Sequence, residues 1–356
     1  MKTILFAPEL FTGGGGIPRI LRLYLKAMCE LSSSGDRVRF LSLNDRVVDS
    51  SELQRYSNAS LVEWEVCNRS KASFVRSAFR MGGNSDRIVC GHIAQLPVAM
   101  AVAMLNPRVR FNLVAHGIEV WRPFTLLERM ALRRAERVWC VSEYTRRQLL
   151  DRCPLPEGRA VVAPNALDPF LEPLAAPTPP PGKPVILAVS RLSVADSYKG
   201  LNHLIDAMPA VLEKVPDARL RIVGRGDALP SLVARARKLN VASAVEFAGY
   251  RSDEELGEDF AACKLFALPS EKEGFGLVYV EAMAHGRPCL GARSGGTPEV
   301  IDAESGMLAE YGNVPEIAAA LVEMLGRDWP VGPLLERART FSYLRFKERL
   351  ASLLTT

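Results

Sequence analysis

Residues 271–286 read EKEGFGLVYVEAMAHG and carry two glutamates eight positions apart, Glu273 and Glu281, on either side of a Gly-Phe-Gly turn. The preceding residues, KLFALPS (264–270), form a short apolar run typical of a buried strand. LVYVEAMAH (277–285) is typical of a helix, and Gly286 stands where helices favour glycine. This succession of strand, glycine turn and helix is typical of the strand–helix units that build a parallel sheet.

Glu281 raises a physical question, because its helix is apolar nearly all round. Burying an unpaired carboxylate is costly, so Glu281 needs hydrogen-bond donors. They are either a backbone amide or an arginine of the protein, or the hydroxyls of a bound ribose, and the spacing does not decide between them. For Glu273, in the turn, the alternatives are a solvated carboxylate and a ligand contact.

The same alternation extends over the rest of the 356 residues, a length that suggests two domains. Six strand-like runs fall between residues 3 and 165, and five between 184 and 293. Amphipathic or apolar helical runs separate many of them, so we predict an α/β protein with two Rossmann-like parallel-sheet domains. Because open parallel sheets bind ligands at the carboxyl ends of their strands, we expect those ends to face a common cleft.

The proline-rich stretch DPFLEPLAAPTPPPGKP (168–184) interrupts helix and strand alike, so it is predicted to be a linker. The expected division is a first domain (1–168), the linker (169–184), a second domain (185–338) and a C-terminal helix (339–356).

Two basic residues follow the first strand of the second half, Arg191 and Lys199 in SRLSVADSYKG (190–200). Fixed cations there suit a diphosphate leaving group, since they stabilise the charge that develops as its bond breaks. The alternative is a pair of surface salt bridges. The chain has no Asp-x-Asp sequence, which a metal-dependent nucleotide-sugar enzyme would want for a divalent ion. We therefore expect no metal and no further cofactor.

A set of motifs resembles the retaining glycosyltransferases of family 4, which have the GT-B fold. The set is dense from residue 185 to about 325 and looser before it. It comprises SRL and YKG, VGRGD, FAGYRSDEEL, VVAPNALD and LPSEKEGFGLVYVEAMAHGRPCLGARSGGTPEVI, with GGGGIPR, AHGIEVW and VSEYT in the first half.

The resemblance implies that residues 1–168 form an N-terminal acceptor-binding domain and residues 185–338 a C-terminal nucleotide-sugar-binding domain, with the C-terminal helix (339–356) crossing back to the first domain. It also implies a role for each matching position. Arg191 and Lys199 would hold the pyrophosphate, and Glu281 the ribose. Glu273 would hold donor-sugar hydroxyls together with the backbone of Phe275 and Gly276. The remaining implied contacts are N–H groups of Leu277 and Val278 to phosphate, backbone near Arg251 to the base, and His116 close to the transferred sugar. For His116 the alternative is a satisfied histidine at a strand end.

The run FTGGGGIPR (11–19) invites a dinucleotide-binding interpretation, but GxGxxG fails because Pro18 or Arg19 replaces the third glycine. By the resemblance, Gly15 and Gly16 belong to a flexible loop that approaches the diphosphate. A tight turn and nothing more is the alternative.

Charge and composition bear on partners and compartment. Residues 1–170 hold 24 Lys+Arg and 16 Asp+Glu, a charge of +8, whereas residues 171–356 hold 21 and 24, a charge of −3. Seven scattered cysteines without a CxxC motif predict reduced thiols in a cytoplasmic protein. The apolar run at residues 93–105 is too short to span a bilayer and predicts a buried helix.

Residues 68–83, NRSKASFVRSAFRMGG, interleave basic residues with Phe74, Val75 and Phe79. As a helix they suit an anionic lipid surface, which would place the protein peripherally at the inner face of the cell membrane. The alternative is an ordinary surface helix whose phenylalanines face the core. No RNA-binding motif accompanies the charges, so we expect no nucleic-acid partner.

The predicted function is metal-independent, retaining transfer of a hexose from a nucleotide diphosphate sugar, GDP-mannose or UDP-glucose, to a saccharide or lipid-linked saccharide acceptor in polysaccharide assembly. Two alternatives remain open at this stage: a nucleotide-sugar 2-epimerase of the same fold, and a non-catalytic nucleotide-sugar-binding protein.

Overall fold

The computed structural model describes residues 1–12, 15–57, 62–171 and 182–355, and these form two compact units. Unit 1 comprises Met1–Asp168 and Tyr343–Thr356, and unit 2 comprises Pro169–Ser342. Most of the expected proline-rich linker, residues 172–181, lies outside the described residues, as do Gly13 and Gly14 of the glycine run.

Unit 1 is built on a seven-stranded sheet in the order β3-β2-β1-β4-β5-β6-β7, in which all pairs of neighbouring strands are parallel. Its strands are β1 (Lys2–Ala7), β2 (Arg37–Ser42), β3 (Val62–Val66), β4 (Arg87–Cys90), β5 (Arg110–Ala115), β6 (Arg137–Cys140) and β7 (Ala160–Val162). Its longer helices are α1 (Gly16–Leu31), α2 (Ser50–Tyr56), α3 (Lys71–Ser77), α4 (Leu96–Leu105), α5 (Leu126–Arg134), α6 (Glu143–Arg152) and α14 (Tyr343–Thr355).

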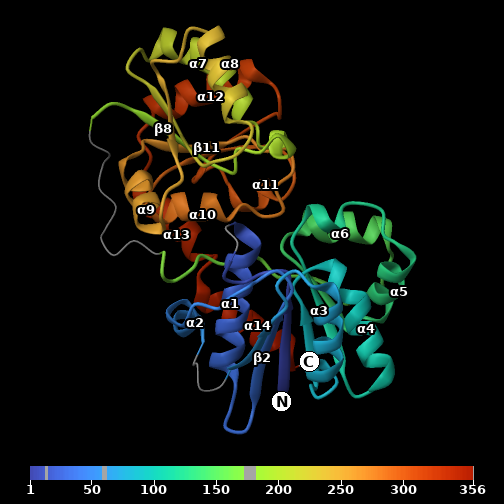
Figure 1. Ribbon diagram of the computed structural model, residues 1–356. Helices are drawn as coiled ribbons and strands as arrows, with labels where there is room; N and C mark the ends of the chain where they lie inside the picture. The colour runs from blue at the N-terminus through green and yellow to red at the C-terminus, as the bar shows by residue number, and fades with distance from the viewer. Residues whose placement is uncertain (13–14, 58–61, 172–181, 356) are drawn as a thin grey trace. The chain divides into compact units, whose positions relative to one another are not determined.

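Helices cover both faces of this sheet, with α1 and α14 on one face and α3, α4 and α5 on the other (Figure 1). Because successive side chains of a strand point to opposite faces, Ile4 and Phe6 of β1 enter one core while Leu5 and Ala7 enter the other. Burial on both faces explains why β1 is an almost continuous apolar run rather than an alternating one.

Helix α14 belongs to unit 1 although it follows unit 2 in the chain. It begins at Tyr343, four residues after the expected start of the C-terminal element. Phe346 packs edge-on against Tyr24 of α1 at 4.9 Å between ring centroids, and Leu350 is buried in the same core. The apolar face of α14 thus completes the core on the α1 side of the sheet.

Unit 2 has a six-stranded sheet in the order β10-β9-β8-β11-β12-β13, again with parallel neighbours throughout. Its strands are β8 (Val185–Val189), β9 (Arg219–Val223), β10 (Val245–Gly249), β11 (Leu265–Leu268), β12 (Cys289–Ala292) and β13 (Gly306–Ala309). Its helices are α7 (Leu201–Lys214), α8 (Leu229–Lys238), α9 (Asp253–Ala262), α10 (Leu277–Ala284), α11 (Thr297–Val300), α12 (Val314–Gly326) and α13 (Val331–Arg339). The prediction of two parallel-sheet α/β domains is confirmed.

Two expectations about helices need correction. Residues 93–105 form a short 3₁₀ turn (Ile93–Gln95) and then α4, and the helix is not buried throughout, because Met104 is 62% and Leu105 77% exposed. Residues 68–83 do not form one regular helix: α3 passes into a π-helical turn, Ala78–Gly82. Phe74 there faces the core, as in the alternative interpretation, whereas Val75 and Phe79 are exposed.

Candidate functional site: a phosphate and sugar site on unit 2

The strand order of unit 2 reverses between β8 and β11, its two central strands. Open parallel sheets bind ligands at such a reversal, outside the carboxyl ends of the two strands, so the loops after β8 and β11 form the expected binding edge. The loop after β8 carries Arg191 and Lys199, and the loop after β11 carries Glu273.

Backbone contacts lock these two loops together. The Glu271 amide donates to the Tyr198 carbonyl at 2.8 Å. Gly200 has a φ of +76°, and a Cβ there would lie 2.3 Å from the Pro269 carbonyl oxygen, so only glycine allows this approach. The YKG sequence therefore ends in glycine because the loop after β8 must touch the loop after β11.

This packing brings together two of the residues predicted from sequence. The Lys199 Nζ lies 2.6 Å from the Glu273 Oε2, and the two side chains are only 21% and 16% exposed. The Lys199 ammonium also lies 5.5 Å from the centroid of the Tyr198 ring. Such a partly buried pair interacts more strongly than a surface ion pair, because less water screens it.

Sequence reasoning missed Lys272, whose ammonium lies 5.9 Å from the Tyr198 ring centroid, on the same aromatic side chain that Lys199 approaches. The available signal was its position directly before Glu273 in a glycine-rich turn. The Tyr198 hydroxyl donates to Asp196 at 3.0 Å, and burial together with this bond raises the pKa of the tyrosine.

The glycine-rich loop after β12 lies beside the loop after β11. The Gly296 amide donates to the Glu273 carbonyl at 2.7 Å, and the Ser294 hydroxyl donates to the Glu271 carbonyl at 2.6 Å. Gly295 has a φ of +62°, and a Cβ there would lie 2.4 Å from the backbone carbonyl oxygen of Glu273. The loop after β12 thus fixes the backbone conformation of Glu273 through these hydrogen bonds.

Helix α10 begins directly beside this glutamate. Gly276 precedes its first residue with a φ of +92°, and a Cβ there would lie 3.3 Å from the Glu273 Cγ. Leu277 and Val278 open the helix, where backbone N–H groups have no intrahelical acceptor and the helix dipole favours an anion.

Phe275 and Glu281 are both buried. The Phe275 ring packs edge-on against Phe341 at 5.1 Å, so only its backbone is available to a ligand. Glu281 lies in the second turn of α10 and is 6% exposed.

Arg191 and Arg251 do not join the Lys199–Glu273 pair. The Arg191 guanidinium is 73% exposed and lies 3.1 Å from Asp196. Arg251 pairs with Glu255 and Asp259 of α9 at 3.2 and 3.4 Å. Arg191 therefore forms a solvent-exposed salt bridge, as in the alternative interpretation of the sequence.

One buried carboxylate, that of Asp45, holds the chain that leads into the glycine run of unit 1. The Asp45 carboxylate accepts hydrogen bonds from the backbone amides of Leu10 and Thr12, at 2.7 Å each, and these bonds fix the chain as it leaves β1. Gly15 then takes a φ of +128° with open space around its Cβ position, and α1 begins at Gly16. A side chain at Gly15 would meet no neighbour, so the requirement for glycine there is conformational.

His116 follows β5 and bonds through Nε2 to the Gly91 carbonyl, 3.0 Å away, at the end of neighbouring β4. Because a carbonyl only accepts, Nε2 carries the proton. Nδ1 is buried without a hydrogen-bond partner among the described residues. Burial lowers the pKa of His116 to about 4, so the imidazole is neutral at neutral pH.

Two features of the described residues bear on metals and membranes. There, no three His, Cys, Asp or Glu side chains are grouped so as to hold a metal ion. Within the same residues, no helix is both long and apolar enough to cross a membrane. All seven cysteines are buried.

Comparison with known proteins gives matches over both units. Residues 28–169 match a family model described as Glycosyltransferase Family 4, and residues 183–327 match one described as Glycosyl transferases group 1. The GDP-mannose-dependent alpha-(1-6)-phosphatidylinositol monomannoside mannosyltransferase of Mycolicibacterium smegmatis is 33% identical over 261 residues, 64% of this chain and 65% of that protein. N-acetyl-alpha-D-glucosaminyl L-malate synthase of Bacillus anthracis is 35% identical over 156 residues, 43% of this chain and 40% of that protein.

The chain thus covers less than two thirds of the length of either relative. Solved structures match over more of their length at lower identity. HepE of Anabaena, in complex with UDP and glucose, has a TM-score of 0.80 at 22% identity, covering 99% of both chains. Sucrose-phosphate synthase from Thermosynechococcus elongatus has a TM-score of 0.78 at 18% identity, covering 100% of this chain and 98% of that one.

These structural matches show a shared fold. The two family models fall one on each side of the expected linker and together account for most of the chain. The chain belongs to the glycosyltransferases of family 4, and its two parallel-sheet units are those of the GT-B fold.

Proposed function

We propose that this protein is a retaining hexosyltransferase that takes its donor, a nucleotide diphosphate sugar, on unit 2. The observation that carries the proposal is the Lys199–Glu273 pair beside the first turn of α10, at the carboxyl ends of β8 and β11. A cation, a carboxylate and free helix N–H groups at one strand edge match the phosphate and hydroxyl groups of such a donor.

Each group has a distinct task in the proposed complex. Lys199 and the amides of Leu277 and Val278 bind the diphosphate, and Arg191 joins them by leaving Asp196. Without donor, the Glu273 carboxylate neutralises Lys199. With donor, the phosphate takes over that charge, and Glu273 accepts hydrogen bonds from sugar hydroxyls. Glu281 binds the ribose, and backbone near Arg251 contacts the base.

The chemical step follows from where charge develops. As the glycosidic bond breaks, negative charge grows on the leaving phosphate, and the fixed cations stabilise it without a metal ion. The acceptor hydroxyl attacks from the same face and gives its proton to the departing phosphate, so the anomeric configuration is retained. His116, neutral at working pH, positions the transferred sugar rather than exchanging a proton.

Similarity supports two donors and one class of acceptor. The mycobacterial relative is named as GDP-mannose-dependent and acts on a phosphatidylinositol monomannoside, and the Anabaena structure holds UDP and glucose. We therefore propose GDP-mannose or UDP-glucose as donor and a saccharide or lipid-linked saccharide as acceptor, with the protein peripheral at the inner face of the cell membrane.

The test is a panel of nucleotide sugars added to the purified protein in EDTA, followed by thermal unfolding. A donor at about 100 times its dissociation constant stabilises the folded state by roughly 2.7 kcal/mol. One donor should raise the melting temperature, and Glu273→Gln should weaken its affinity by about 10–100-fold, since hydrogen bonds to charged groups contribute about 1.5–3 kcal/mol.

Lys264→Met is the matched control, because Lys264 belongs to unit 2 and pairs with Asp328 at 3.9 Å, just before β11 begins. It should leave donor affinity unchanged, whereas Lys199→Met should lower it. A protein stabilised by no nucleotide sugar, or a Glu273→Gln variant with normal affinity and turnover, would contradict the proposal. Return of an isomerised nucleotide sugar without acceptor would instead identify an epimerase.

A further inference from the structure

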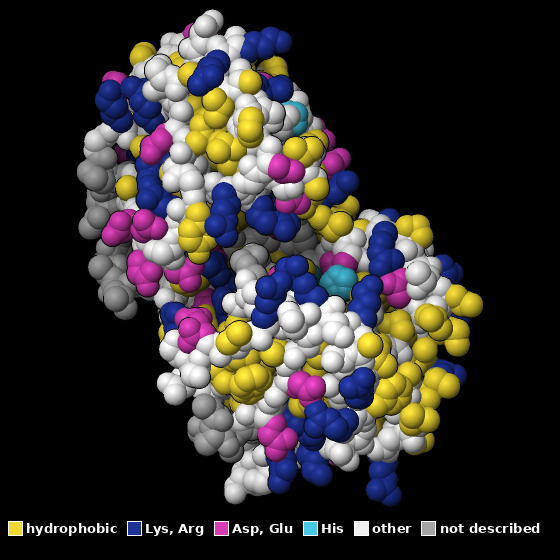
Figure 2. Space-filling view, viewed as in Figure 1, with side chains coloured by type: hydrophobic (Ala, Val, Ile, Leu, Met, Phe, Trp, Pro, Cys, Tyr) yellow, Lys and Arg dark blue, Asp and Glu magenta, His cyan; other side chains and the backbone are white. Residues whose placement is uncertain are grey.

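Helices α4 and α5 of unit 1 expose large apolar side chains that the fold does not use. Leu126, Leu127 and Met130 of α5 are 74%, 57% and 40% exposed. Met104 and Leu105 end α4, also largely exposed. We call these five residues the α4–α5 surface. Figure 2 shows hydrophobic side chains gathered over this side of unit 1.

The apolar exposure of α5 is not explained by packing. Its inner side already fills the core through Ala131 and Leu132, which are fully buried. A surface helix of a water-soluble domain normally opposes such a face with polar residues. In α5, however, the solvent-facing side of the first two turns is also apolar. Contiguous exposed apolar surface is typical of a protein or membrane contact.

Positive charge surrounds this surface. Arg108 lies just after α4, and Arg129, Arg133 and Arg134 lie on α5. Among the described residues, none of these four arginines forms an ion pair with a carboxylate. The acids nearby are already neutralised: Glu128 accepts two bonds from Arg122, at 2.6 and 3.0 Å, which lower the pKa of the carboxyl to about 2.

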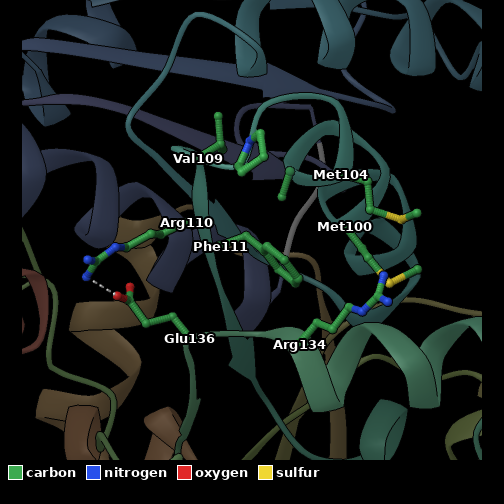
Figure 3. Close-up of a pocket in the computed structure, with 9 residues that line it drawn as sticks. Met100, Met104, Val109, Arg110, Phe111, Arg134 and Glu136 are labelled. Atoms are coloured by element: carbon green, nitrogen blue, oxygen red, sulfur yellow. Dashed lines mark hydrogen bonds and ion pairs between the residues drawn. The ribbon is translucent and has the colours of Figure 1, made fainter.

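A groove of about 380 Å³ lies beside the surface. Figure 3 shows Met100, Met104 and Phe111 along it, with Arg134 at one end and the Arg110–Glu136 pair at the other. An apolar groove that ends at a guanidinium without an acidic partner suits an amphiphile with an anionic head and a hydrocarbon tail.

We infer that the α4–α5 surface docks on a lipid bilayer that contains anionic phospholipid. Leucine and methionine enter the interface, and the four arginines meet lipid phosphates. Charge complementarity selects this occupant, because the four arginines beside the apolar patch have no carboxylate partner among the described residues, whereas Glu128 and Glu136 are paired with arginines. The inference does not depend on the proposed sugar transfer.

This docking surface is separate from the candidate site. The segment expected to bind membrane, residues 68–83, lies next to it, because the Asn106 side-chain amide just after α4 donates to the Gly83 carbonyl at 2.9 Å. Arg110, which lines the groove, is the first residue of β5, whereas His116 follows the last residue of that strand. Six residues of extended chain separate those ends by about 20 Å. The anchoring helices are α4 and α5 rather than α3.

The test measures sedimentation of the whole protein with phosphatidylcholine vesicles, with and without phosphatidylglycerol, in the absence of nucleotide. The wild type should bind only the anionic vesicles, and less as salt rises. The triple change R129Q, R133Q, R134Q should lower the partition coefficient about 100-fold, since each basic residue near an anionic surface contributes about fivefold. L126S, L127S, M130S should lower it at least about tenfold.

The matched control is V47S with L344S, which removes two apolar side chains of unit 1 that are 74% and 59% exposed away from this surface. It should bind like the wild type, and equal melting temperatures will show that every variant is folded. Absent binding to anionic vesicles, or unchanged binding by both triple variants, overturns the inference. So does wild-type self-association that the apolar triple variant abolishes while vesicle binding persists, which would assign the surface to a second copy of the chain.

Discussion

Replacing Gly276 by alanine should destabilise unit 2 far more than the same change at Gly249. Both glycines have positive φ, +92° and +74°. A Cβ at Gly249 meets nothing within 4 Å, whereas a Cβ at Gly276 would lie 2.4 Å from the Tyr279 ring. The pair therefore separates backbone strain from collision at the helix start that forms the candidate phosphate site.

The magnitude follows from these contacts. A left-handed alanine costs about 1–2 kcal/mol, partly offset by about 0.4–1 kcal/mol lost from the freedom of the unfolded chain, so Gly249→Ala should cost about 1 kcal/mol. At Gly276 the fully buried Tyr279 ring must also move, which strains the core and breaks the 2.5 Å bond from its hydroxyl to the Leu268 carbonyl. Together these effects bring the cost to about 4 kcal/mol.

Thermal unfolding followed by far-ultraviolet circular dichroism measures the difference. For a unit of this size, 1 kcal/mol shifts the melting temperature by about 2–4 °C, so we expect about 3 °C at Gly249 and about 8–16 °C at Gly276. Tyr279→Phe, which removes only the hydroxyl, should fall between them. Equal shifts for the two glycine variants would refute the reasoning, because collision with the Tyr279 ring would then contribute nothing.

Two further predictions concern unit 1. The pKa of His116 is lowered to about 4 when folded, so the unfolded chain binds a proton there that the folded chain does not; the free energy of unfolding should fall by roughly 3 kcal/mol as pH drops from about 6.5 to about 4. His116→Asn should lack this part of the pH dependence in urea titrations, and an identical pH profile would contradict the assigned burial. Phe346→Ala in α14 should cost about 3–5 kcal/mol, because the ring is 3% exposed and packs on Tyr24. Lys347→Ala, on the same helix but in a partly exposed pair with Glu30, should cost less than about 1 kcal/mol; similar losses for both would show that α14 does not complete the core.

Some elements were predictable because their local pattern and their burial agree. The run around β11 and the glycine turn before α10 needed only strand apolarity, turn residues and a helix-ending glycine. The edge strands β3 and β13 were not predicted. β3, VEWEV, is paired on one side only and carries two glutamates. β13, GMLA, is also an edge strand and has two half-buried residues, so neither resembles the buried central strands.

The candidate site divides in the same way. Sequence named Lys199 and Glu273 separately, but their 2.6 Å approach depends on the contact between the loops after β8 and β11. The approach of Lys272 to the Tyr198 ring and the salt bridge of Arg191 with Asp196 became visible only once the chain was folded, because such contacts depend on side-chain directions that spacing does not encode. The exposed side of α4 was equally hidden, since the residues at its end resemble those of a buried helix.

The sequence by itself determined the fold class, the parallel sheets and the position of the glycine turns, because periodicity and glycine tolerance are local properties of the chain. Only the tertiary structure decided which charges meet and which apolar residues stay in water. Those outcomes depend on strand order, and the reversal between β8 and β11 joins residues 74 positions apart in sequence. Local pattern specifies the elements, and the long-range packing of loops at strand ends specifies the site.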